Sequence, residues 1–197
     1  MTPEEFTHSW IKIAEPLTPL SPVRLNSFNL KLETKEFLIK AGLPTSAAPM
    51  LRFTKDTDDI VYGITKLVEL YDFEEDWAKF DKYVVIGSCR DGDPIAINTD
   101  ENDLIEELDH GNGFTPKYFN SSINALAGFL VIYRNFEHSV LTEHGEEGWQ
   151  NFYFTDAQFD LLKSRMLSID HKALTEEGFW KDELELIISL RKEYLEK

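Results

Sequence analysis

The sequence is poor in cysteine, in basic side chains and in long apolar runs, and each shortage excludes a class of protein. Its single cysteine, Cys89, permits neither an internal disulfide nor a cluster of thiolate metal ligands, which fits a reducing cytoplasm. Only 20 lysines and arginines face 36 aspartates and glutamates, so the net charge is −16. Phosphate backbones and anionic membrane surfaces repel such a chain, and we expect neither nucleic acid nor a membrane as a direct partner.

No stretch of the sequence is suited to enter a membrane. The longest apolar run, residues 125–133, is far shorter than the about 20 residues that a spanning helix needs. Residues 1–10 contain neither the basic nor the apolar region of a secretion signal. We therefore expect a cytoplasmic protein.

Apolar residues are plentiful enough for a hydrophobic core, since 42% of the 197 positions are hydrophobic. Domains commonly hold about 100–200 residues, so one domain over 1–197 is the simplest prediction. Its first 36 residues are expected to form a helix and an extended link of unassigned role. Residues 2–5 make a capping box, Phe6, Trp10 and Ile13 share one helical face, and three prolines within 16–22 prevent the helix from continuing.

Short elements are expected in the next part of the chain. Thr34 is placed to cap a second helix that stops at Gly42. Between residues 50 and 71 the segments LRF, IVYGI and KLVELY favour short strands. A helical turn or two is expected within residues 73–82.

The clearest local pattern predicts four antiparallel strands in succession, which is a meander. Asp91-Gly92 is typical of a type I′ turn between two apolar runs, and Asn112-Gly113 marks a second tight reversal. The four strands are expected at residues 83–87, 94–98, 103–109 and 114–119.

After Asn120 the apolar period changes from 2 to 3.6, which indicates helices. One begins after Ser122, a second begins at a capping box that opens with Thr155, and a third contains Trp180. Because strands and helices are segregated along the chain, we predict an α+β fold with a central antiparallel sheet, the meander, flanked by helices.

Motifs of the common catalytic and cofactor-binding classes are missing, among them a phosphate-binding loop, GxSxG, HExxH, GxGxxG and an EF-hand loop. We therefore expect no cofactor and no metal. One catalytic alternative uses Cys89 as a nucleophile, His110 as its base and an aspartate such as Asp91 to orient the base. A small residue of a strand is the commoner role for such a cysteine.

Two other groups contain residue types that serve chemistry. A stretch that reads as a solvated polar loop contains metal-competent side chains without the regular spacing of a metal site, namely His138, Glu143, His144, Glu146 and Glu147. Three adjacent carboxylates, Glu74, Glu75 and Asp76, suit acid–base work only if burial separates their pKa values, and a surface charge run is the simpler interpretation.

The acidity itself is clustered. Between Asp91 and His110 there is no basic side chain other than the histidine, and this segment holds the carboxylates Asp91, Asp93, Asp100, Glu101, Asp103, Glu106, Glu107 and Asp109. On a meander these eight side chains are expected to form a negative surface that binds a partner. A second acidic stretch, 56–76, is interleaved with Tyr71 and Phe73 and followed by Trp77; we expect Phe73 and Trp77 in the core.

The order of several motifs resembles the SUKH superfamily of Smi/Knr-like proteins, most closely its fourth subgroup of bacterial immunity proteins. The matching pieces are FLIKAGLP (37–44), KYVVIGSCRDGDPIAIN (82–98), LIEELDH (104–110), YFNSSINALAGFL (118–130) and GFWKDELELI (178–187). The resemblance implies one SUKH-like α+β domain without catalytic residues. In the family pattern Gly42, Gly87, Gly92, Asn120 and Trp180 have structural roles.

The resemblance also implies a function, which is to bind and neutralise a polymorphic toxin. A nuclease toxin is basic around its phosphate site, so the acidic surface is expected to occupy that site and to accelerate encounter. Two alternatives stay open. One is a Smi/Knr-type interaction scaffold without a toxin partner, and the other is an enzyme built around Cys89 and His110.

Overall fold

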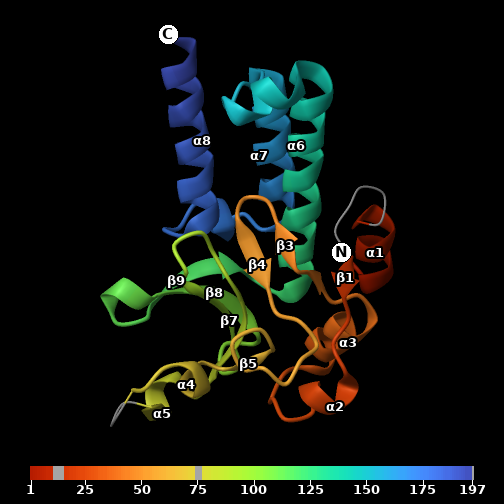
Figure 1. The fold of residues 1–197 in the computed structure, drawn as a ribbon, viewed down its shortest axis with the longest axis vertical. Helices are drawn as coiled ribbons and strands as arrows, with labels where there is room; N and C mark the ends of the chain where they lie inside the picture. The colour runs from red at the N-terminus through yellow and green to blue at the C-terminus, as the bar shows by residue number, and fades with distance from the viewer. Residues whose placement is uncertain (11–15, 74–76, 197) are drawn as a thin grey trace.

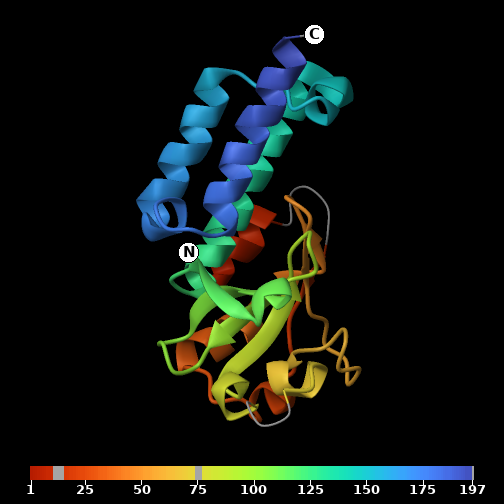
Figure 2. The ribbon, with the colours of Figure 1, turned by 90° about the vertical axis from the view of Figure 1, so that its left-hand side faces the viewer.

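The computed structural model describes residues 1–10, 16–73 and 77–196. Helices pack on an antiparallel sheet, and three long helices extend together beyond one end of it (Figure 1). The view turned by 90° has the strands and short helices at one end and the C-terminal helices at the other (Figure 2). The predicted α+β fold is confirmed.

The main sheet has seven strands in the order β3-β4-β6-β7-β8-β9, and β5 pairs with β6. Each of these pairs is antiparallel. The strands are β3 (Ser46–Ala47), β4 (Leu51–Phe53), β5 (Thr65–Lys66), β6 (Tyr83–Ser88), β7 (Pro94–Asn98), β8 (Leu104–Asp109) and β9 (Thr115–Asn120). A separate pair joins β1 (Leu17–Thr18) to β2 (Leu43–Pro44). The run from β6 to β9 is the predicted meander, which is confirmed.

Both faces of the meander are apolar, which explains why β7 is buried along its whole length. On one face Val84 and Ile97 join the main core beneath the long helices. On the other face, here called the outer face, Val85 and Leu108 belong to a smaller core. Two short helices contribute to this smaller core, α4 (Leu67–Leu70) and α5 (Trp77–Phe80).

The turn between β6 and β7 is not of type I′. The Gly92 N–H donates to the Cys89 carbonyl, and the Cys89 N–H donates to the Asp93 carbonyl, both at 3.0 Å. A type I′ turn needs positive φ at both central residues, but of Asp91 and Gly92 only the glycine has it, at 83°. The hairpin instead has a three-residue loop that ends in a left-handed glycine.

The other helices are α1 (Pro3–Trp10), α2 (Pro22–Leu25), α3 (Leu32–Lys40), α6 (Ile123–Gln150), α7 (Asp156–Ile169) and α8 (Phe179–Leu195), with 3-10 turns at His110–Asn112 and Lys172–Leu174. The predicted capping boxes that begin at Thr2 and Thr155 are present, and Ser122 caps α6. The N-terminal helix is part of the main core, because Phe6 is fully buried and Trp10 nearly so.

Several local predictions were wrong. The N-cap of α3 is Lys31, and Thr34 is buried inside the helix. The LRF strand is present as β4, but Ile60–Tyr62 lie in an exposed turn and Leu67–Leu70 form a helix rather than a strand. These short apolar runs fit a turn or a helix as well as a strand, and tertiary packing decides between them.

Two further corrections concern polar and aromatic residues. The expected polar loop around His138 is a continuation of α6, which is interrupted at Gly145 by a φ of 72°. Trp77 is 55% exposed rather than in the core, whereas Phe73 does stack on Phe80 at 4.2 Å between ring centroids. Ile13 and the three carboxylates Glu74, Glu75 and Asp76 lie outside the described residues.

Candidate functional site

The eight carboxylates of the predicted binding surface are divided among different parts of the sheet. Asp91 is exposed on the turn between β6 and β7, and Asp100 and Glu101 are exposed on the turn between β7 and β8. Successive turns of an antiparallel meander lie at opposite ends of the strands. A strand rises about 3.4 Å per residue, so β7 separates the two groups by roughly 15 Å.

Three of the eight carboxylates are buried. Asp103 is 2% exposed and accepts a hydrogen bond of 2.8 Å from the Lys31 N–H at the start of α3. Asp93 and Glu107 are 7% and 6% exposed and lie close to Cys89, where their ligand atoms are within 4.8 Å of one another. The eight carboxylates therefore do not all lie on one exposed surface.

The last two of the eight are half-buried and already have partners within the chain. Glu106 accepts a hydrogen bond of 2.7 Å from the Asn98 amide, and Asp109 pairs with Lys117 at 3.3 Å. Consequently Asp91, Asp100 and Glu101 are the predicted side chains that solvent reaches most freely.

A groove of about 440 Å³ lies on the outer face of the sheet, and the predicted set did not include it. Val85 and Gly87 of β6 and Pro94 of β7 contribute to its lining from the sheet. The loop that contains Val61 and Tyr62 lines it too, and so does the end of α4 with Leu70 and Tyr71. The Asp91 turn lies beside it, because Gly92 is also a lining residue.

Several large side chains at this groove are much more exposed than side chains of the core. Val61 is 68% exposed, Tyr62 60% and Tyr71 36%. Tyrosine offers a large rigid ring together with a polar hydroxyl and is enriched among residues that anchor interfaces. The groove therefore has the residue types of a protein-binding site.

The loop tip that presents Val61 and Tyr62 is held by its own hydrogen bonds. The Asp59 carboxylate accepts from the Val61 N–H at 2.9 Å, and the Asp59 carbonyl accepts from the Gly63 N–H at 2.7 Å. Gly63 is required there, since a Cβ at this position would lie 2.4 Å from the Thr57 carbonyl oxygen. A loop ordered before binding loses little conformational entropy when a partner arrives.

Carboxylates lie on the same loop and turns. Asp56 and Asp58 both pair with Arg24 at 2.8 Å, and the Asp58 side chain remains fully exposed. Burial raises the pKa of Tyr71, and the negative charge of Asp93 raises it further. Acidic residues thus lie on the loop that presents Tyr62, and a negative charge acts on Tyr71.

Comparison with known proteins identifies the chain. A family model described as SUKH-4 immunity protein matches residues 14–186. The chain belongs to the SUKH-4 immunity protein family. No curated protein and no solved structure matches it. The match confirms the resemblance derived from the motif order, and it extends that resemblance N-terminally to residue 14.

In this SUKH-4 chain the suspected catalytic trio is not assembled. An aspartate does contact the base, since His110 Nδ1 lies against an oxygen of Asp93, while Asp91 is exposed. The Cys89 thiol, however, donates to Glu107 Oε1 at 3.3 Å rather than to His110. Burial raises the pKa of Cys89 to about 12, so the thiol stays protonated at neutral pH. A protonated thiol that faces a carboxylate is a poor nucleophile.

Some metal-competent residues of the SUKH-4 chain, Glu107, Glu143 and His144, have contacts within it. Burial raises the pKa of Glu107, and the hydrogen bond from Cys89 stabilises the carboxylate that burial destabilises. On α6, Glu143 accepts a hydrogen bond of 3.0 Å from Gln158 of the α7 capping box. The ring of His144 packs edge-on against Tyr153 at 4.7 Å.

Sequence reasoning missed the groove because it assigned Val61 and Tyr62 to a strand. A signal was nevertheless present: the apolar run Ile60–Tyr62 directly follows the closely spaced acidic residues Asp56, Asp58 and Asp59. Exposed turns rarely place three large apolar residues together unless a partner covers them.

Proposed function

We propose that this SUKH-4 immunity protein binds a cognate toxin and neutralises it without catalysing a reaction. We infer that the toxin is a basic nuclease and that binding takes place in the cytoplasm. The observation that carries the proposal is the pair of exposed tyrosines, Tyr62 and Tyr71, at one groove, with exposed carboxylates on the loop that presents Tyr62. Family membership supports the immunity role.

Charge supports a basic partner. The chain has a net charge of −16. Asp91 is exposed on the turn that contributes Gly92 to the groove, and Asp58 and Asp59 are exposed on the loop that presents Val61 and Tyr62. A nuclease presents cations where phosphates bind, and complementary charge accelerates encounter to about 10⁸ M⁻¹s⁻¹ or above at low salt. The bound chain then blocks the nucleic acid sterically and by repulsion.

Apolar contacts set how long the complex lasts. A few buried aromatic anchors usually dominate the binding energy, whereas charges at the rim mainly affect the association rate. Tyr62 and Tyr71 are therefore expected to control the dissociation rate. The three carboxylates are expected to control association and its dependence on salt.

The test begins with a partner captured on the tagged chain from cells that make it. The captured polypeptide is assayed for cleavage of DNA and RNA with and without added chain. We expect a basic nuclease that the wild-type chain inhibits, and about tenfold or greater weakening by Tyr62→Ser together with Tyr71→Ser. The matched control is Tyr194→Ser, since Tyr194 on α8 is also 36% exposed.

The charge contribution is tested separately with Asp58→Asn, Asp59→Asn and Asp91→Asn in one chain. Association should slow and lose most of its salt dependence. A control with the same change in net charge, Asp160→Asn, Glu185→Gln and Glu193→Gln, alters exposed carboxylates on α7 and α8 and should leave association nearly unchanged. A captured partner without toxicity would support the scaffold alternative instead.

A further inference from the structure

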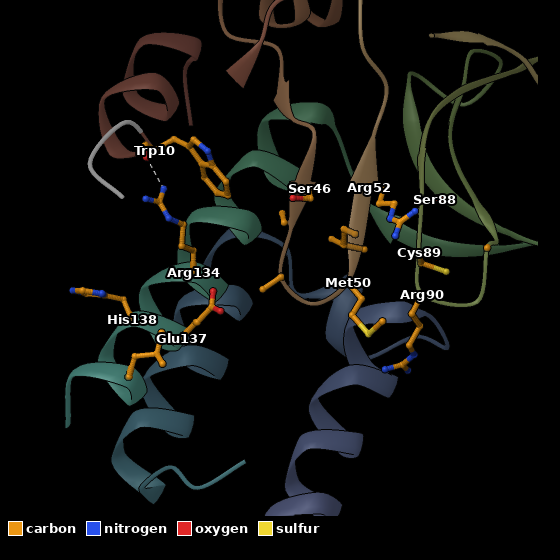
Figure 3. A pocket seen from close by; sticks show the side chains of 15 residues that line it. Trp10, Ser46, Met50, Arg52, Ser88, Cys89, Arg90, Arg134, Glu137 and His138 are labelled. Atoms are coloured by element: carbon orange, nitrogen blue, oxygen red, sulfur yellow. Dashed lines mark hydrogen bonds between the residues drawn. The ribbon is translucent and has the colours of Figure 1, made fainter. Parts of the chain in front are cut away.

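A second cleft lies next to the outer groove, with which it shares the lining residues Arg52, Ser88 and Gly92, and the function proposed above does not use it. It has a volume of about 700 Å³. Its walls are the hairpin of β3 and β4, the turn after β6, Trp10 of α1 and the middle of α6 (Figure 3). A volume of this size accommodates a small molecule or several residues of a peptide.

One wall of the cleft is the edge of the sheet. β3 is the terminal strand in the sheet order, and its residues Ser46 and Ala47, followed by Ala48, line the cleft. Terminal strands present backbone donors and acceptors to a further strand. The small side chains leave room beside the backbone. Figure 3 shows that β3, which carries Ser46, is the strand of the hairpin nearer to α6. An edge strand that faces a helix is a geometry in which extended peptides bind by β-augmentation.

The opposite wall contains a buried arginine with unused hydrogen-bonding capacity. Arg134 of α6 is 9% exposed, its Nη1 donates to the Trp10 carbonyl at 2.6 Å, and its guanidinium carbon lies 4.4 Å from the centre of the Trp10 ring. Within the described part of the chain, Arg134 Nη2 is buried and has no hydrogen-bond partner. A buried charged donor without an acceptor is costly, so this atom suits a ligand oxygen.

The remaining charges of the cleft also favour an anion. Three arginines line it, Arg52, Arg90 and Arg134, in a chain with only six. Arg90 is engaged by Glu183 at 2.8 Å. The one carboxylate of the lining is Glu137, whose pKa is raised by burial and lowered by Arg134. The lining is therefore positive on a chain that is negative as a whole.

We propose that this cleft binds an extended peptide segment with an acidic side chain, which adds a strand to β3 and directs its carboxylate to Arg134. Backbone pairing with β3 supplies a sequence-independent part of the affinity. The carboxylate accepts the N–H that Arg134 Nη2 leaves unused, as a charge-assisted hydrogen bond. Ala47, Ala48 and Leu141 receive the apolar neighbours of the acidic residue.

The test uses a library of short peptides with blocked termini, alternating apolar residues and a central Glu, Gln or Lys, presented to the intact chain. Glu peptides should bind about tenfold more tightly than their Gln counterparts, and Lys peptides should bind least. Methylating alternate backbone nitrogens of a bound peptide should abolish binding. Amide exchange at Ser46, whose N–H points away from β4, should slow on binding. Equal affinity for Glu and Gln peptides, or retained binding after methylation, would overturn the proposal.

Variants locate the site. Arg134→Gln should remove the preference for Glu over Gln, whereas Arg165→Gln, at an exposed arginine of α7, should preserve it. If Arg134→Gln does not fold, Arg52→Gln at the exposed rim serves instead and should reduce the preference several-fold. Peptides with a free C-terminus and no acidic side chain test whether the bound carboxylate comes from a side chain or from a chain end. If these bind more tightly than blocked Glu peptides, the ligand is a chain end and the proposal fails.

Discussion

The hydroxyl of Tyr133 on α6 donates a hydrogen bond of 2.8 Å to Oε1 of the buried Glu183 on α8. The other oxygen of Glu183 accepts from Arg90 Nη1, also at 2.8 Å. Both carboxylate oxygens are thus satisfied, which is how an acidic side chain only 4% exposed is accommodated beneath the long helices. The network joins α6, α8 and the turn after β6.

Replacing Glu183 with alanine should therefore destabilise the fold. The change leaves the Tyr133 hydroxyl buried without an acceptor and removes the partner of Arg90, and we expect a loss of about 2–3 kcal/mol in the free energy of unfolding. Urea denaturation measures it. The exposed Glu185 on the same helix is the control, because Glu185→Ala should change stability by no more than about 0.5 kcal/mol. Equal effects of the two changes would contradict the role of the network.

Stability should fall as the pH rises from mildly acidic to alkaline. Burial raises the pKa of Glu107, Glu137 and Glu183 above the ordinary value of 4.5. Such groups bind more protons in the folded than in the unfolded chain. Their favourable contribution to the free energy of unfolding is therefore complete below pH 4.5 and is lost as the pH rises through their pKa values in the folded chain. Asp56, whose pKa is lowered by Arg24, acts oppositely, but only as the pH falls below its ordinary value of 3.8.

Thermal unfolding between about pH 5 and pH 8 tests this dependence. Repulsion within a chain of net charge −16 acts in the same direction, and a pair of variants separates the two effects. Glu183→Gln and Glu185→Gln remove one charge each, but only the buried position should make the decline with pH shallower. If stability declined equally steeply with pH in both variants, general charge repulsion would be the cause of the decline.

The periodic parts of the fold could be predicted from the sequence, and the parts that depend on tertiary packing could not. Glycine-containing turn dipeptides between apolar runs predicted β6 to β9, and capping boxes located α1 and α7, because those signals involve neighbouring residues only. The helix at Leu67–Leu70 was misread as a strand, since a segment of four residues, three of them apolar, has too few positions to reveal its period.

The site was harder to predict than the fold, because composition does not reveal which carboxylates face solvent. The sequence gives no sign that Asp103 and Asp100 differ. In the fold, however, Asp103 is buried and accepts a hydrogen bond from the Lys31 N–H, 72 positions away. The cleft did leave a trace: Arg134 follows Leu126 and Leu130 at intervals of four, so it lies on an apolar helical face. A cation in that position indicates a buried charge that needs a partner.

Two glycines with positive φ should differ in their tolerance of a side chain. Gly42 has φ 68°, and a Cβ there would lie 2.0 Å from the Thr18 carbonyl oxygen, whereas Gly92 has φ 83° and open space around it. Gly92→Ala should cost about 1 kcal/mol for the left-handed backbone alone. Gly42→Ala should cost at least about twice as much, because β1 has to move as well. Equal losses in urea denaturation would show that the close approach of β1 to Gly42 does not constrain the chain.

Cys89 should resist thiol reagents as long as the chain is folded. Cys89 is only 5% exposed, and a pKa raised to about 12 leaves almost no thiolate at neutral pH. Iodoacetamide should therefore label the native chain far more slowly than the chain unfolded in urea, and mass spectrometry follows the modification. Rapid labelling of the native chain, with a rate that levels off near neutral pH, would reveal an accessible thiolate. That outcome would revive the enzymatic alternative built on Cys89, because a nucleophile needs both charge and access. Burial denies Cys89 the access, and burial together with the contact to Glu107 disfavours the charge.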